Sequence, residues 1–382
     1  IKGLGKIKLE KEFDEIDYVI IKEGKNLDFT SNIKLSELIL KNQNFTKKIF
    51  PAINDQINLK DHQINVIYKD KNLSIKGLGK IKLEKEFDEI DYNILKNKNK
   101  FEFKTNLNLY KTLFKIDQLN YKKNKKTNTE LNIVGDYEKN KGLNLYELSI
   151  VEKNNHIIIK NFILNKENKI LKVDEVDLNY LDIENKKNKV LLLRSKKNNY
   201  EIKGSVFNGN TLISDLLKGN EKKHSRIFKN NINLTLNLSE VYIDEKNVIK
   251  DLKGKIFIKD NKLTQANIKG FFDDNENLTF TVSTNNDEKV TTLFSSRAKP
   301  LVKRYKFIKG YEEGYLDFYS SKKNNISNSK LKLYNFKLQE LPALTKILTL
   351  ASLQGIADLL SGEGIRFNEF EMNFKNKKDL MK

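Results

Sequence analysis

The sequence comprises 382 residues, of which 38% are hydrophobic, 32% are charged, 22 are Phe and 15 are Tyr. This aromatic content excludes a disordered chain, and the lack of Cys excludes disulfides and thiolate metal sites. The formal net charge of +20 suits a polyanion-binding protein, but the lysines are spread along the chain beside asparagines, which favours a solvated sheet face over a basic binding patch.

An internal repeat opens the chain. Residues 1–18 and 75–92 are identical over all eighteen positions. The residues that follow, 19–40 and 93–114, share only five identities but keep their apolar positions, which is typical of a repeated structure with a relaxed sequence. The matching positions are Leu27, Phe29, Ile33 and Leu35 in the first copy and Phe101, Phe103, Leu107 and Leu109 in the second.

We therefore expect three regions along the chain. Residues 1–74 form a first β-repeat unit, and residues 75–200 form a second unit that continues the same groove. Residues 201–382 form a C-terminal region that contains a helix at about 343–360.

Period-two alternation of apolar and polar residues runs from residue 1 to about residue 340. It is clearest in "KFEFKTNLNLY" (100–110) and in "INLTLNLSEVYI" (232–243). Because successive side chains of a strand point to opposite sides, this pattern predicts strands with one apolar face. Turn clusters separate similar runs by about 8 to 12 residues, so we predict a long antiparallel meander. The inward residues are Phe101, Phe103, Leu107 and Leu109 in the first run and Ile232, Leu234, Leu236 and Leu238 in the second.

Two arrangements would satisfy such strands. A closed sandwich or barrel buries the apolar faces against each other, whereas a sheet curled into an extended open groove needs another apolar partner. A fatty acyl chain qualifies, because each buried methylene contributes about 0.8 kcal/mol, or on the order of 12 kcal/mol for sixteen carbons. The fold class that we expect is mainly β, with an open apolar groove.

One apolar helix is predicted near the C-terminus. Pro342 suits its first turn, and Gly362 and Gly364 suit its end. It is shorter than the roughly 20 apolar residues of a membrane span. We expect it to cap the groove, with docking on a membrane surface or on a partner protein as the alternatives. Its apolar stripe consists of Leu344, Ile347, Leu348, Ala351, Ile356, Leu359 and Leu360.

These residues also carry a family likeness. The segment "LPALTKILTLASLQGIADLLSGEGIRFNEFEMNF" (341–374) resembles the C-terminal signature of the AsmA-like proteins of Gram-negative bacteria, specifically their YhdP-like branch. Two weaker segments fit in order: "IKGSVFNGNTLISDLL" (202–217) resembles the family's strand–turn–helix, and "FIKGYEEGYLDFYS" (307–320) resembles its hairpin. The likeness is sharpest from about residue 200 to residue 374.

The resemblance implies a bridge-like lipid-transfer protein. Members of this family carry phospholipid between the inner and outer membranes along a β-groove in the periplasm, without enzymatic chemistry. The family's N-terminal inner-membrane anchor is missing from this chain, so we expect an anchored protein of which this is a fragment. The partners implied are phospholipid, the two membrane surfaces and unknown envelope proteins, with no nucleic acid.

No residue pattern predicts catalysis. His62, His156 and His224 have no ligand-like spacing, and we expect them to be satisfied surface residues. No nucleophile elbow is present, and we predict no enzyme, metal or cofactor. Two alternatives to lipid transfer stay open: a structural β-rich envelope scaffold with a sealed core, and a polyanion-binding basic surface.

Overall fold

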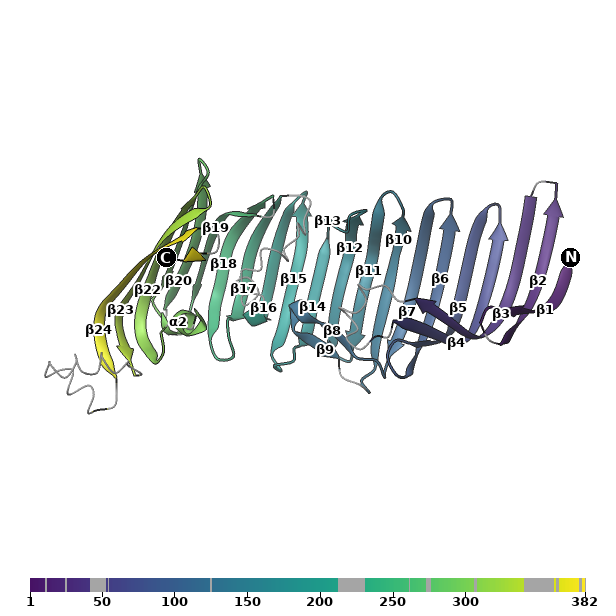
Figure 1. Cartoon of the computed structure of the whole chain (residues 1–382), viewed down its shortest axis with the longest axis horizontal. Helices are drawn as coiled ribbons and strands as arrows, with labels where there is room; N and C mark the ends of the chain where they lie inside the picture. The colour runs from purple at the N-terminus through teal and green to yellow at the C-terminus, as the bar shows by residue number, and fades with distance from the viewer. Residues whose placement is uncertain are drawn as a thin grey trace. The chain divides into compact units, whose positions relative to one another are not determined.

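The computed structural model is mainly β-strand, which confirms the predicted fold class at that level. Its described residues fall into two compact units, one within Ile1–Arg194 and the other within Ser195–Ile213 and Asn230–Lys382 (Figure 1). The description covers residues 1–10, 12–24, 26–41, 53, 55–123, 126–211, 231–260, 262–272, 276–305, 308–339, 361, 364–377 and 380–381.

Unit 1 is a sheet in which neighbouring strands pair antiparallel. Tight turns join them, and the turn at Asp70 and Lys71 has φ values of 50° and 64°, as a two-residue hairpin loop requires. The strands are β1 (Lys2–Lys8), β2 (Phe13–Glu23), β3 (Asn26–Lys41), β4 (Gln56–Lys69), β5 (Asn72–Lys82), β6 (Phe87–Asn97), β7 (Lys100–Leu109), β10 (Thr129–Glu138), β11 (Gly142–Glu152), β12 (Asn155–Asn165), β13 (Ile170–Lys172), β14 (Glu175–Leu181) and β15 (Lys187–Lys196).

A small hairpin interrupts this order between β7 and β10, which pair directly with each other. It consists of β8 (Phe114–Ile116), the 3₁₀ turn η2 (Asp117–Leu119) and β9 (Tyr121–Lys123). The Tyr180 hydroxyl of β14 donates to the carbonyl oxygen of Leu119 at 2.7 Å, and the Tyr121 hydroxyl donates to Glu152 at 2.7 Å. The hairpin is thereby fixed against β11 and β14 at one end of the strands, which we call the closed end of unit 1.

Unit 2 is also an unclosed sheet. We predicted an antiparallel meander, but this sheet contains one parallel pair of strands. Its first two strands pair in parallel, with Ile202 opposite Leu236. Parallel pairing needs a crossover, and the connection of residues 209–231 is long enough to return the chain. The strands are β16 (Asn199–Asn208), β17 (Ile232–Tyr242), β18 (Val248–Lys259), β19 (Lys262–Phe271), β20 (Asn277–Asn285), β21 (Glu288–Ser295), β22 (Tyr311–Lys323), β23 (Ile326–Leu338), β24 (Ile365–Lys377) and β25 (Leu380–Met381).

A short helix, α2 (Lys299–Tyr305), lies between β21 and β22. Ala298 and Val302 are fully buried in a cluster with Leu316 and Leu333. Arg304 donates to the carbonyl oxygen of Asn210 at 2.7 Å, which ties the helix to the end of β16. Helix α2 defines the closed end of unit 2.

Both region boundaries expected from the sequence lie within strands, and the predicted C-terminal helix is not among the described residues. Residues 74 and 75 lie inside β5, so both copies of the repeat belong to one sheet. The boundary expected at residue 200 lies in β16, near the division between the units at residues 194 and 195. The helix expected at 343–360 lies outside the described residues.

Asp88 of β6 fixes the chain where it leaves the sheet at the closed end of unit 1. Its side chain is 3% exposed, and it accepts hydrogen bonds from the backbone N–H groups of Tyr110, Lys111 and Thr112 at 2.9, 2.8 and 2.9 Å. A buried donor without a partner costs about 1–3 kcal/mol. This carboxylate therefore stabilises the turn that leads from β7 into the β8–β9 hairpin.

We predict that Asp88→Ala lowers the free energy of unfolding by about 3 kcal/mol, because it leaves the buried N–H group of Thr112 and two partly buried N–H groups without their acceptor. Urea unfolding followed by circular dichroism measures the change. Asp91→Ala, at an exposed position on the same strand, is the matched control and should stay within about 0.5 kcal/mol of wild type. Equal effects of the two substitutions would contradict this role of Asp88.

Candidate functional site

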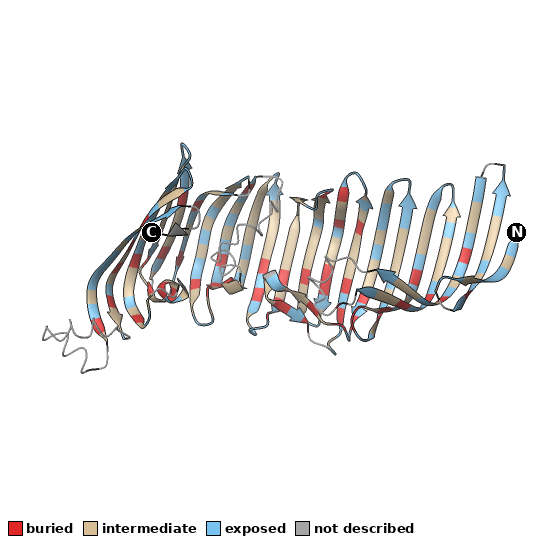
Figure 2. Cartoon of the chain, viewed as in Figure 1, coloured by how far each residue is buried: buried red, intermediate tan, exposed pale blue. Residues whose placement is uncertain are grey.

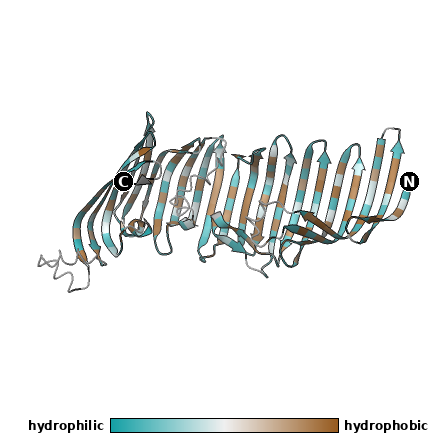
Figure 3. Cartoon of the chain, viewed as in Figure 1, coloured by the Kyte–Doolittle hydropathy of each residue, from teal (hydrophilic) through white to brown (hydrophobic). Residues whose placement is uncertain are grey.

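Strand register places apolar side chains in rows across unit 1. Directly paired residues on neighbouring strands point to the same side of a sheet, so a chain of pairs marks one face. We call the side of the sheet that carries the row from Ile16 to Leu192 the apolar face of unit 1. The strands show alternating apolar and polar positions (Figure 3). From β2 to β15 the row is Ile16, Ile33, Ile64, Gly77, Tyr92, Thr105, Ile133, Leu148, Ile159, Val176 and Leu192.

Burial on this face decreases away from the closed end. Apart from Gly77, the residues of that row are half-buried. The adjacent row toward the closed end is more deeply buried, with Ile150 at 3% and Ile157 at 1% exposure (Figure 2). Next to it the ring of Tyr121 in β9 packs edge-on to Tyr180 of β14, with centroids 5.6 Å apart. The β8–β9 hairpin therefore covers one end of the apolar face and leaves the middle row partly accessible.

The four residues predicted on β7 follow this gradient. Leu109 and Leu107 are buried, Phe103 is half-buried, and Phe101 is 38% exposed. Leu107 pairs with Ile90 and Phe103 pairs with Ile94, so both belong to the rows of the apolar face. The structure thus places all four on one side of the sheet.

The four residues predicted on β17 also share one side, in unit 2. Ile232 and Leu238 are buried, Leu234 and Leu236 are half-buried, and the intervening Asn237 is exposed. Leu236 belongs to a row that crosses the whole sheet, and the side that carries this row is the apolar face of unit 2. From β16 to β24 this row is Ile202, Leu236, Gly254, Ile268, Phe280, Leu293, Phe318, Leu331 and Met372.

The seven residues predicted on the capping helix are not placed by this structure. They all lie outside the described residues, and they are Leu344, Ile347, Leu348, Ala351, Ile356, Leu359 and Leu360.

Most residues of the two apolar faces were not named from the sequence. Ile133 and Leu148 in unit 1, and Phe280, Leu293 and Phe318 in unit 2, occupy the same rows as the predicted residues. Alternation in "LTFTVST" and in the "GYLDFYS" segment is the signal that could have identified Phe280 and Phe318. Leu148 can be assigned to this face only from the strand register, because a bulge in its strand interrupts the alternation of apolar and polar residues.

His62 corrects the expectation of surface histidines. It is 1% exposed and lies on the apolar face, where an added Cβ at Gly79 would come within 2.4 Å of its ring. Its Nε2 lies 3.0 Å from the carbonyl oxygen of Lys80 and its Nδ1 lies 3.3 Å from the hydroxyl of Tyr92. The Nε2–H donates to the carbonyl, and Nδ1 accepts from Tyr92, as in a neutral imidazole. Burial lowers the pKa of His62.

The repeated "GLGK" segment has a packing explanation. In both copies the first glycine faces a tyrosine ring of the next strand, with Gly3 under Tyr18 and Gly77 under Tyr92. An added Cβ would lie 2.6 Å from the first ring and 2.3 Å from the second, so only glycine leaves the space. The segment therefore accommodates aromatic side chains on the apolar face.

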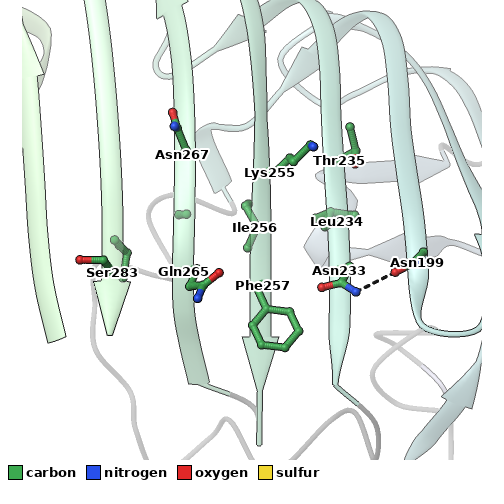
Figure 4. A pocket seen from close by; sticks show the side chains of 12 residues that line it. Asn199, Asn233, Leu234, Thr235, Lys255, Ile256, Phe257, Gln265, Asn267 and Ser283 are labelled. Atoms are coloured by element: carbon green, nitrogen blue, oxygen red, sulfur yellow. Dashed lines mark hydrogen bonds between the residues drawn. The ribbon is translucent and has the colours of Figure 1, made fainter. Parts of the chain in front are cut away.

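The opposite face of each sheet is polar. In unit 1, Lys34 pairs with Glu15 at 3.0 Å and Lys160 pairs with Glu175 at 2.7 Å across neighbouring strands. In unit 2 Asn233 donates to the side-chain oxygen of Asn199 at 2.7 Å (Figure 4). A hollow of about 690 Å³ in this region is lined by residues of both sides of the sheet, with Asn233, Lys255 and Phe257 from the polar face and Leu234, Ile256 and Val282 from the apolar face.

The described residues offer little chemistry beyond burial of apolar surface. No group of three or more His, Asp or Glu residues among them is arranged to hold a metal ion. Nor does the described part of the chain contain a helix of the length and hydropathy needed to cross a membrane.

No family model, curated protein or solved structure matches this chain. Its function must therefore be argued from the apolar faces themselves.

We predict that His62 makes stability dependent on pH. Its folded pKa lies below the unfolded value of about 6.5, so the unfolded chain binds the proton more readily. The stabilisation is complete above about pH 6.5 and decreases as the pH falls through that value toward the folded pKa. Urea midpoints at about pH 7.5 and about pH 5 measure this loss.

One variant isolates the effect. His62→Gln should reduce the difference between the two midpoints. An unchanged difference in His62→Gln would show that other groups cause the pH dependence.

Proposed function

We propose that this chain binds phospholipid by its acyl chains along the two apolar faces and transfers it, without enzymatic chemistry, between the inner and outer membranes. The observation that carries the proposal is the half-buried row of aliphatic and aromatic side chains on each sheet, exemplified by Ile133, Leu148, Leu236 and Phe280. Each face acts as a groove open along one side. The lipid tails lie on these rows, and the headgroups lie at the strand ends opposite the closed end.

The energetics favour a long apolar ligand. Every buried methylene contributes about 0.8 kcal/mol, so a single acyl chain can supply on the order of 10 kcal/mol before the cost of ordering it. Apolar contacts have no directional requirement, and neighbouring positions on a row are nearly equivalent. A ligand held in this way can move along a row without breaking any particular bond, as transfer requires.

The resemblance to the YhdP-like branch supports the same activity and gives it a compartment. Of its two weaker segments, 202–217 includes most of β16, and 307–320 includes the start of β22, both strands of the unit 2 sheet. In this proposal the protein works in the periplasm, anchored to the inner membrane by a segment outside this chain. Its other partners are the membrane surfaces and further envelope proteins.

The alternatives are less well supported. A scaffold with a sealed core would bury all of its middle rows as deeply as Ile157. Leu331 of unit 2 is nearly that deeply buried, but most residues of the two rows, such as Leu236 and Phe280, are half-buried. A polyanion site would need free cations on the polar face, and several of its lysines already contact carboxylates. Lys332, for example, contacts both Glu369 at 2.9 Å and Glu371 at 3.0 Å.

We predict that a carboxylate on either apolar face abolishes lipid binding nearby. Phe103→Asp in unit 1 and Leu236→Asp in unit 2 each place a charge where the acyl chain lies, and burying that charge costs several kcal/mol. We expect at least a tenfold loss of copurified phospholipid, which native mass spectrometry measures.

The adjacent outward positions provide matched controls. Lys104→Asp and Asn237→Asp introduce the same group on the polar face of the same strands, where both residues are exposed. They should bind lipid as wild type does. A wild-type chain that carries no phospholipid, or inward variants that bind as much as the outward ones, would refute the proposal.

A further inference from the structure

The apolar face of unit 2 changes character along its strands. At the closed end, Leu316 and Leu333 are buried in the cluster under α2. Two residues further along β22 the row of Leu293, Phe318 and Leu331 is still fully apolar. Each such step covers about 6.8 Å of strand. The sheet therefore presents a graded surface over a distance comparable to the length of a lipid.

The next row carries hydroxyl groups. Thr291 pairs with Ser320, which pairs with Ser329, and the Ser329 hydroxyl donates to the Ser320 hydroxyl at 2.8 Å. Thr291 and Ser320 lie two residues from Leu293 and Phe318 on the same strands, so their side chains point to the same side of the sheet. They mark the transition from a hydrocarbon surface to a polar one.

Two lysines follow at the open end of the same face. Lys289 and Lys322 are direct cross-strand partners on β21 and β22, one further step beyond Thr291 and Ser320. Lys289 is half-buried and Lys322 is exposed. Like charges placed directly opposite each other in a sheet are destabilising. A bound anion between them would remove this repulsion.

The groups around this pair do not neutralise it. In the described part of the chain no ion pair includes either lysine. Glu288 points to the other side of the sheet, where Ser321 donates a hydrogen bond to it. Thr284, opposite Lys289, donates to the carbonyl oxygen of Thr264 at 2.9 Å. Burial and the charge of Lys322 both lower the pKa of Lys289.

We propose that Lys289 and Lys322 form a headgroup site for the phosphodiester of a phospholipid with a net negative charge. The glycerol region lies beside Thr291 and Ser320, and the acyl chains lie on Leu293 and Phe318. This assignment rests on the proposed function and adds the lipid class to it. The pair favours an anionic lipid over a zwitterionic one, because each lysine near a phospholipid headgroup contributes about fivefold in affinity.

The test uses the full 382-residue chain. The protein is incubated with vesicles of equal parts dioleoyl phosphatidylglycerol and dioleoyl phosphatidylcholine, and native mass spectrometry gives the ratio of the two lipids bound. We expect wild type to favour phosphatidylglycerol by about tenfold or more. The Lys289→Ser/Lys322→Ser double variant should lose this preference, and Lys289→Arg/Lys322→Arg should retain it.

A matched control exists on the polar face of the same sheet. Lys253 and Lys269 are also direct cross-strand partners, on β18 and β19, and both are exposed. Lys253→Ser/Lys269→Ser removes the same charge from the chain and should leave the lipid ratio unchanged. An equal loss in both double variants would mean that only net charge matters, which overturns the assignment.

The remaining outcomes are distinct. If wild type binds both lipids equally, or the Lys289→Ser/Lys322→Ser variant keeps the preference, the headgroup site is refuted while the proposed function stands. If neither lipid binds, the proposed function fails as well. An excess of inorganic phosphate serves as a separate arm: complete loss of the preference under it, with phosphate bound in the absence of lipid, would identify a free-anion site and overturn the lipid assignment.

Discussion

The structure depends on one constraint, which is that a strand presents its apolar residues to one side and something must remove them from water. In both units neighbouring strands supply part of this cover, because side chains in a row pack against each other along the sheet. That packing leaves the middle rows half-buried, as at Ile133 in unit 1 and Leu236 in unit 2. The remaining apolar surface is what makes each face a candidate for a hydrocarbon ligand.

The two units cover one end of this face in different ways. Unit 1 uses the β8–β9 hairpin, whose Lys123 is fully buried and donates to the carbonyl oxygen of Thr112 at 3.0 Å. Unit 2 uses helix α2, whose apolar residue Val302 enters the sheet cluster directly. One cation of each covering element, Lys123 in unit 1 and Arg304 in unit 2, donates to a backbone carbonyl oxygen. These bonds offset part of the cost of placing polar groups against an apolar face.

The open ends of the faces differ in chemistry. In unit 1 the apolar character continues toward the open end through Phe103 and Phe101. In unit 2 a hydroxyl row and then Lys289 and Lys322 follow the apolar rows. A ligand with a hydrocarbon part and an anionic part matches the second gradient along its whole length. The two sheets thus share the same alternation but differ in the side chains at their open ends.

The sequence alone determined the strand content and the side of the strand on which the residues of β7 and β17 lie. Both follow from a local rule, since period-two alternation acts within a few residues. Register required the tertiary structure. Leu145 and Leu148 are three residues apart and break the alternation, yet the bulge opposite Val134 and Gly135 returns both to one face.

Three further features depended on contacts between segments distant in the chain. The parallel pairing of β16 and β17, the burial of His62 over Gly79 and the pairing of Lys289 with Lys322 have no local signal in the sequence. Alternation along a strand determines which side a residue faces, but it does not specify which strand lies beside it. The partner strand decides what each side chain meets, so the graded face of unit 2 exists only in the folded sheet.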